Sequence, residues 1–194
     1  METSFKQIRI LILSTLLIAL AIINGCANMS EIVTDRSAGL NGSFEVTKSG
    51  LPVNWHIYSP GTIPSGNYKL IFDNVVFKSG KQSLKFDVKD CSSDGGWLSP
   101  GCFQTVPAST GKSYKISFWL KNQECEYRLL IGSERPQMPG YHSGKTYHSK
   151  ESIPNWKQFE HQYTIPEGFE NIKFELNILQ PGVLWLDDVK IEEL

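Results

Sequence analysis

The stretch Ser113-Tyr114-Lys115-Ile116-Ser117-Phe118-Trp119-Leu120-Lys121 alternates side chains in steps of two, with Tyr114, Ile116, Phe118 and Leu120 on one side. Successive side chains of a β-strand point to opposite faces, so this period predicts a strand with one buried face. Residues 83–88 and 172–178 repeat the pattern, and residues 183–191 form a final apolar run. Weaker candidates lie at 55–58, 69–72, 75–77, 103–106, 126–131 and 159–165, with turn residues between them. About nine to ten short strands predict an all-β, two-sheet β-sandwich.

Two further features of the chain limit its fold and its function. The stretch between Ile131 and Trp156 is rich in glycine, proline and histidine, and we expect a long surface loop with one short strand there. The 194 residues carry 19 Lys and Arg against 20 Asp and Glu, with a sequence pI near 6.4. This balance argues against nucleic acid as a partner, because phosphates require a basic face. The length is that of one domain.

The first 25 residues predict a lipoprotein signal peptide. Lys6 and Arg9 precede residues 10–23, in which Ser14 and Thr15 are the polar residues. This run is shorter than the roughly 20 apolar residues of a membrane-spanning helix. It ends in Ile23-Asn24-Gly25-Cys26, which resembles the lipobox of bacterial lipoproteins.

That resemblance implies lipidation of Cys26 and an anchor in the membrane of the bacterial cell envelope, periplasmic or surface-exposed. A plain secretory signal with an incidental cysteine is the alternative. We expect residues 26–38 to be the lipidated cysteine and a polar tether, and residues 39–194 to be the folded domain.

Three cysteines remain after Cys26, and an exported chain meets an oxidising compartment. Cys91 and Cys102 flank a glycine- and serine-rich loop, so a disulfide between them would join its ends. A Cys102–Cys125 disulfide and three free thiols are the alternatives. The spacing of these cysteines does not suggest a zinc site.

Seven short motifs occur in an order that resembles a known family. They are Asn41-Gly42-Ser43-Phe44-Glu45, Gly50-Leu51-Pro52 with Trp55, Ser79-Gly80-Lys81-Gln82-Ser83-Leu84, Gln104-Thr105-Val106, Gly111-Lys112-Ser113-Tyr114, Trp156 before Tyr163-Thr164-Ile165-Pro166, and Leu184-Trp185-Leu186-Asp187-Asp188-Val189. In this order the chain resembles the carbohydrate-binding modules of families 4, 9 and 22, over residues 39–193. The resemblance implies a jelly roll of the galactose-binding-domain type. It also implies that Trp55 and Trp156 are core residues and that Trp119 packs under a loop.

The resemblance implies a structural calcium ion where the first and last strands meet. Glu45 and Asp187 match the carboxylate positions of the family. The backbone carbonyls of Ser43 and of the Lys78–Lys81 turn are the expected neutral ligands, since calcium prefers six to eight oxygens. Asp188 is the alternative to Asp187. Glu45 and Asp187 could instead cap exposed strand ends.

The resemblance also implies a saccharide site on the concave face. Trp97 matches the position of a platform aromatic, in the loop between Cys91 and Cys102. Its alternative role is packing within that loop. The other expected lining residues are Tyr127, Arg128, Glu175, Asn177, Tyr141 and Tyr147.

We therefore expect a non-catalytic carbohydrate-binding lipoprotein that holds a poly- or oligosaccharide at the cell envelope. One alternative is a structural or adhesive surface lipoprotein that keeps the calcium-stabilised jelly roll without a sugar site. A more distant one is a small polysaccharide lyase with an acid–base cluster of His142, Tyr147 and His148. A glycosidase would need two carboxylates across a cleft, and Glu175 has no evident partner in the sequence.

Overall fold

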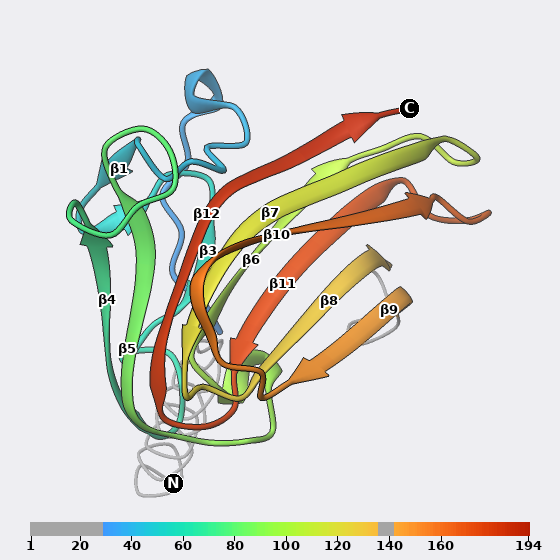
Figure 1. Cartoon of the computed structure of the whole chain (residues 1–194). Helices are drawn as coiled ribbons and strands as arrows, with labels where there is room; N and C mark the ends of the chain where they lie inside the picture. The colour runs from blue at the N-terminus through green and yellow to red at the C-terminus, as the bar shows by residue number, and fades with distance from the viewer. Residues whose placement is uncertain (1–28, 136–141) are drawn as a thin grey trace, which may run out of the picture.

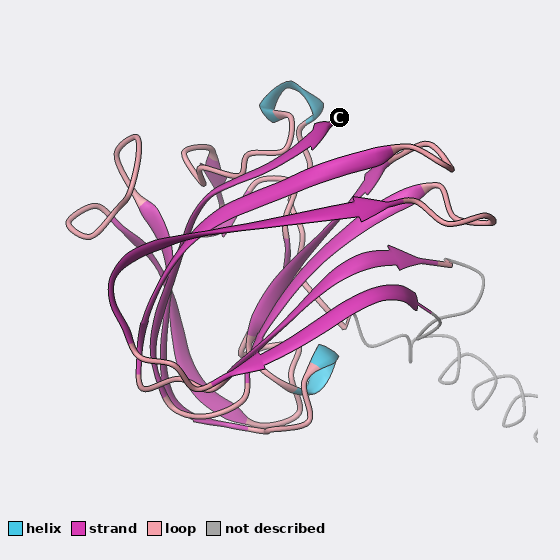
Figure 2. Ribbon diagram, turned by 45° about the vertical axis from the view of Figure 1, so that its right-hand side comes forward, coloured by secondary structure: helices cyan, strands magenta, loops and turns pink. Residues whose placement is uncertain are grey.

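The chain folds into two antiparallel five-stranded sheets that face each other, as a computed structural model describes for residues 29–135 and 142–194 (Figure 1). We call the first the terminal sheet. Its strands, in spatial order, are β10 (Ile153–Thr164), β7 (Ser113–Gln123), β12 (Gly182–Glu193), β5 (Ser83–Cys91) and β4 (Gly66–Asp73). The second is the groove sheet, with β3 (His56–Tyr58), β6 (Gly101–Pro107), β11 (Asn171–Ile178), β8 (Tyr127–Glu134) and β9 (His142–Ser149). A small hairpin of β1 (Thr47–Lys48) and β2 (Leu51–Pro52) and two short 3-10 turns, η1 (Arg36–Ala38) and η2 (Gly96–Leu98), complete the described elements (Figure 2).

The predicted two-sheet β-sandwich is confirmed, and most predicted strands occur within a few residues of their expected bounds. The strand expected at residues 75–77 is wrong, because this segment is an exposed turn between β4 and β5 in which Val75 is 82% exposed. The long loop expected between Ile131 and Trp156 is also wrong. The end of β8, all of β9 and the start of β10 lie in that stretch.

The core between the sheets is built from the apolar faces of the alternating strands. Trp55 is fully buried, as predicted, with its ring centroid 5.1 Å from that of Phe44 and 5.9 Å from that of Phe174. Phe118 of the terminal sheet packs edge-on against Phe174 at 5.3 Å. Trp156 is only half-buried on the edge strand β10, where the pairing register with β7 shifts between Ile153 and Lys157, so its predicted place in the core is wrong.

Residues 29–38, part of the segment that we expected to be a polar tether, bond to β3 and to Asn54 just before it. Glu31 and Ile57 exchange both backbone N–H···O hydrogen bonds at 2.8 Å, so the segment extends the sheet beyond β3. The Asn54 backbone N–H donates to the Val33 carbonyl at 2.7 Å, and Asn54 Nδ2 donates to the Asp35 carbonyl at 2.7 Å. The folded unit therefore begins well before residue 39.

Candidate functional site

A cavity of about 650 Å³ opens on the groove sheet and crosses all five of its strands. The strand register places His56, Phe103, Glu175, Leu130 and Thr146 side by side in one row. The adjacent row consists of Tyr58, Gly101, Asn177, Arg128 and His148. Cross-strand neighbours share a face. The residues between the two rows, such as Cys102, Leu129 and Leu176, belong to the core, so the rows lie on the outer face of the sheet. Except for His56, Gly101 and Asn177, the residues of these rows line the cavity, together with Met29, Ser30, Gly96, Trp97, Glu134, His142 and Lys173.

Four charged side chains form a chain of alternating sign along the floor of this groove. Glu175 Oε1 lies 3.6 Å from an Arg128 guanidinium nitrogen, and Glu175 Oε2 lies 3.1 Å from Lys173 Nζ. Lys173 Nζ also contacts Glu134 Oε2 at 2.8 Å. The two cations and two carboxylates balance, so the floor offers many hydrogen-bonding groups without a net charge.

The protonation states of this chain follow from its burial and its ion pairs. Burial alone would lower the pKa of Lys173, but Glu175 and Glu134 outweigh burial and raise it, so Lys173 stays charged. Burial and the neighbouring Glu175 raise the pKa of Tyr58, which stays a phenol and donates to Glu175 Oε1 at 3.3 Å. A sugar hydroxyl both donates and accepts hydrogen bonds. It can therefore bind where an accepting side chain lies next to a donating one.

Trp97 stands at the rim of the groove, on the short turn η2. Its side chain is 46% exposed, whereas most aromatic residues between the sheets are fully buried. Asn177 of β11 fixes the backbone of this turn. Its Oδ1 accepts from the Gly96 N–H at 3.0 Å, and its Nδ2 donates to the Gly96 carbonyl at 3.1 Å.

Gly95 is required at the start of this turn. Its φ is +76°, and a Cβ there would lie 2.5 Å from the guanidinium carbon of Arg128. Arg128 itself donates to Asn177 Oδ1 at 2.6 Å, so the turn, Asn177 and Arg128 form one unit. The predicted glycine-rich loop beside Trp97 is thus shaped by the residues of the groove floor.

The predicted disulfide between Cys91 and Cys102 is not present, since Cys91, Cys102 and Cys125 are all free thiols. Cys91 ends β5 of the terminal sheet, whereas Cys102 lies in β6 of the groove sheet and is fully buried. Ser99 closes the loop between these strands instead. Its hydroxyl accepts from the Gly95 N–H at 2.8 Å and donates to the Ser92 carbonyl at 2.6 Å.

The structure places Trp97, Arg128 and Glu175 in the groove, as expected. Asn177 lies beneath the Trp97 turn. Tyr127 is wrong as a lining residue, because it alternates with Arg128 on β8 and is buried in the core. Tyr147 is also wrong, because it points between the sheets, where its ring lies 4.7 Å from His161. Tyr141 lies outside the described residues.

Sequence reasoning missed much of the groove floor. Tyr58, Phe103 and Lys173 line the cavity, and the His56 ring stacks on Phe103 with 4.3 Å between centroids. A usable signal existed for Lys173, because it shares the polar side of its alternating strand with Glu175 and Asn177. His142 and His148 face the groove from β9 but Tyr147 does not, so the lyase-like cluster is not brought together.

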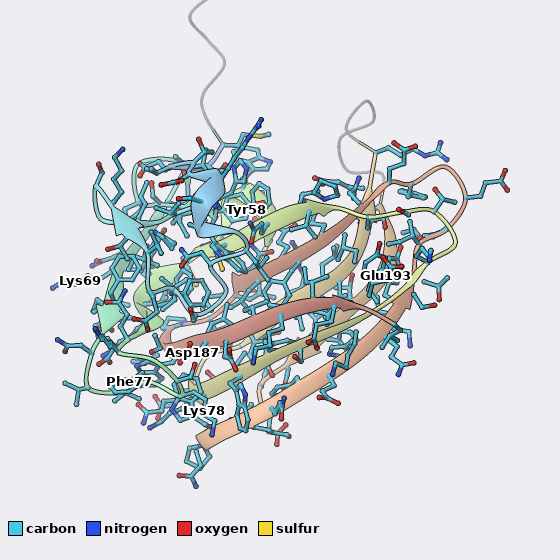
Figure 3. All side chains as sticks on the ribbon, turned by 90° about the horizontal axis from the view of Figure 1, so that it is seen from above. Tyr58, Lys69, Phe77, Lys78, Asp187 and Glu193 are labelled. Atoms are coloured by element: carbon cyan, nitrogen blue, oxygen red, sulfur yellow. The ribbon has the colours of Figure 1, made fainter. Side chains whose placement is uncertain are left out.

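The second predicted site, for calcium, does not fit the observed contacts. Asp187 Oδ2 accepts from the backbone N–H groups of Lys78 and Ser79 at 2.8 and 3.0 Å (Figure 3). Glu45 Oε1 accepts from the N–H groups of Lys81 and Gln82 at 2.8 and 3.2 Å. In a trans peptide the carbonyl points opposite to the N–H. The Lys78 and Lys81 carbonyls, which share peptide units with the N–H groups of Ser79 and Gln82, therefore point away from these carboxylates.

The two carboxylates are engaged by backbone amides and, in the described part of the chain, are not gathered with further acidic side chains. No group of three or more His, Cys, Asp or Glu side chains suited to a metal occurs in residues 29–135 and 142–194. Burial raises the pKa of Asp187, and the N–H groups of Ser79, Lys78 and Asp188 oppose that rise. Glu45 and Asp187 thus bind the 78–82 turn through its backbone amides.

A scan of known protein families finds no match, and a search of curated proteins finds none either. Solved structures do match. A family 4 carbohydrate-binding module is 18% identical, with a TM-score of 0.57, and the match covers 79% of this chain and 98% of that one. The CBM22-1 xylan-binding domain of Xyn10C from Paenibacillus barcinonensis is 14% identical, with a TM-score of 0.55, over 78% of this chain and 91% of that one.

The chain has the fold of carbohydrate-binding modules. The predicted jelly roll of this type is therefore confirmed. The same fold also occurs within enzymes. The enzymatically active domain of tailspike protein 4 from bacteriophage CBA120 is 15% identical, with a TM-score of 0.61, over 79% of this chain but only 21% of that one.

Proposed function

We propose that this protein is a non-catalytic carbohydrate-binding lipoprotein, anchored through Cys26, that holds an oligo- or polysaccharide at the cell envelope. The observation that carries the proposal is the exposed Trp97 at the rim of a groove whose floor alternates cations and carboxylates. An indole face packs against the C–H side of a pyranose, and the floor can satisfy its hydroxyls. The fold of the similar solved modules supports the same function.

The charges of the groove disfavour catalysis. Glu134 and Glu175 are the two carboxylates that face each other here, and Lys173 Nζ contacts both, at 2.8 and 3.1 Å. A glycosidase needs one of its two carboxyl groups protonated to act as the general acid. Because both carboxylates are paired with the same Lys173 ammonium, neither is free to donate a proton to a glycosidic oxygen.

The test is a glycan array probed with residues 29–194, which include the whole described fold. We expect saccharide binding by the wild-type domain and its loss in Trp97→Ala. Lys89→Ala, a solvent-exposed change on the other sheet, is the matched control and should bind like wild type. If a correctly folded domain binds no saccharide on the array, a structural or adhesive role replaces the proposal.

A further inference from the structure

The N-terminal segment forms one end of the groove. Ser30 and Met29 line the cavity, and the Ser30 hydroxyl lies 3.0 Å from His56 Nδ1. Glu31 pairs with Ile57 in the antiparallel sense, so the chain runs from Ile32 beside His56 toward Ser30 beside Tyr58. It leaves the sheet at the edge where Tyr58, Gly101 and the Trp97 turn lie.

This exit point is close to Cys26. Only three peptide units separate Cys26 from Met29, and these span at most about 11 Å when fully extended. The polar layer on each side of a bilayer is roughly 5–7 Å thick. A lipid anchor on Cys26 would therefore hold this end of the groove at the membrane surface.

The exposed groups at this edge suit such a position. Trp97 and Met29, 46% and 55% exposed, stand beside the groove rather than in the core. The groove floor carries no net charge, since Arg128 and Lys173 balance Glu175 and Glu134. It therefore provides no reason to select a charged headgroup, and its alternating donors and acceptors match a neutral, hydroxyl-rich one.

We propose that the groove is a membrane-proximal site for the saccharide headgroup of a neutral glycolipid in the same membrane. The segment at residues 29–31 closes the β3 end of the groove, so a long free polymer would meet this segment and the bilayer beyond it. A short headgroup presented by the bilayer would meet neither obstacle. This inference rests on the proposed saccharide binding and on the proposed anchor at Cys26.

The position of the groove is tested with the full-length acylated protein in phosphatidylcholine vesicles that contain a headgroup-labelled acceptor lipid. Donor dyes are placed at Ser93→Cys, beside the Trp97 turn, and at Val75→Cys, in a Cys91→Ala background in which the other two thiols are fully buried. These two sites flank opposite ends of β5, whose nine residues span roughly 30 Å. We expect the acceptor to quench the Ser93 dye several-fold more than the Val75 dye.

A tether variant is the matched control for position. A Gly/Ser spacer of about 20 residues between Ala27 and Asn28 has a root-mean-square length of roughly 25 Å and should remove the difference between the two dyes. Equal quenching of both dyes with the native tether would overturn the membrane-proximal position.

The ligand class is tested by adding digalactosyl- or diglucosyl-diacylglycerol to the vesicles and following the emission of the Ser93 dye. We expect the emission of the Ser93 dye to change at a several-fold lower glycolipid fraction with the native tether than with the spacer. No response to either lipid, with the dye close to the bilayer, overturns the glycolipid assignment while array binding by residues 29–194 still supports saccharide binding. A domain that is silent on the array refutes the proposed function itself, whatever the dyes report.

Discussion

The side-chain amide of Asn177 forms two hydrogen bonds with the backbone of Gly96, accepting from its N–H at 3.0 Å and donating to its carbonyl at 3.1 Å. Asn177 is fully buried, whereas the neighbouring Trp97 is among the most exposed aromatic residues of the described chain. A buried residue of the floor thus orients an exposed residue of the rim. Together with the Ser99 hydrogen bonds to Gly95 and Ser92, this relationship holds the loop for which the sequence suggested a disulfide.

We expect Asn177→Ala to weaken saccharide binding more than its effect on stability would explain. The change leaves both backbone groups of Gly96 without their partner, at a cost of about 1–3 kcal/mol in unfolding free energy. It also frees the Trp97 turn. Asn177→Asp keeps the oxygen that accepts from the Gly96 N–H but loses the amide donor. Its saccharide affinity should therefore lie between those of wild type and Asn177→Ala. Affinity equal to wild type in Asn177→Ala, measured by calorimetry, would show that the turn needs no support.

Three aromatic substitutions should separate affinity from stability. Trp97→Ala should lose saccharide affinity with little change in melting temperature, because the side chain is half exposed. Trp55→Ala opens a cavity in the core and should cost about 3–5 kcal/mol of unfolding free energy. Tyr127→Ala should resemble Trp55→Ala, since Tyr127 belongs to the core. Thermal unfolding and affinity measured on all three provide the comparison, and a strongly destabilised Trp97→Ala would assign Trp97 to packing.

The 78–82 turn should be held by its amides rather than by calcium. Gly80 has φ +66°, and a Cβ there would lie 2.3 Å from Glu45 Oε1. Gly80→Ala should therefore lower stability by about 1–3 kcal/mol, through strain and the displaced carboxylate. The melting temperature should be the same in calcium and in chelator. A calcium-dependent rise that Asp187→Asn abolishes would contradict this account.

Stability should fall as the pH drops below about 6.5, partly through His56. In the folded state the pKa of His56 is lowered, mainly by burial and to a smaller extent by the positive charge of Lys173. Between that lowered value and about 6.5 the unfolded chain binds more protons than the folded one, so stability decreases with decreasing pH. His56→Gln should flatten this part of the profile. Burial also lowers the pKa of His161, so some dependence should remain in the variant.

Removing residues 29–38 should destabilise the domain. The truncation deletes the two Glu31–Ile57 backbone bonds and the bonds from Asn54 to Val33 and Asp35. At about 0.5–1.5 kcal/mol each, these four bonds amount to roughly 2–6 kcal/mol. Chemical unfolding of residues 39–194 beside residues 29–194 measures the difference, and equal midpoints would show that the segment only rests on the fold.

The fold and part of the site could be predicted from the sequence because they depend on local chemistry. The alternation of residues 113–121 and 172–178 specified the faces of β7 and β11, and burial follows directly from that period. The position of Trp97 beside the groove was indicated by the family resemblance, which implied a platform aromatic in this loop. The order of motifs, from Asn41 to Val189, was sufficient to indicate the jelly roll.

What only the tertiary structure decided depends on partners far apart in the chain. Whether Asp187 meets a carbonyl or an N–H is settled by the direction of peptide planes around Ser79, more than 100 residues away. The hydrogen bonds between Asn177 and Gly96 also join residues that are far apart in the sequence. So does the ion pair of Lys173 with Glu134. Only the fold brings these residues, and Glu175 beside Lys173, together. The fold also decides the place of residues 29–38, whose polar composition suggested a tether. The backbone of this segment bonds to β3, which is the edge strand of the groove sheet. The amino-acid composition of a segment does not reveal which strand will lie at the edge of a sheet.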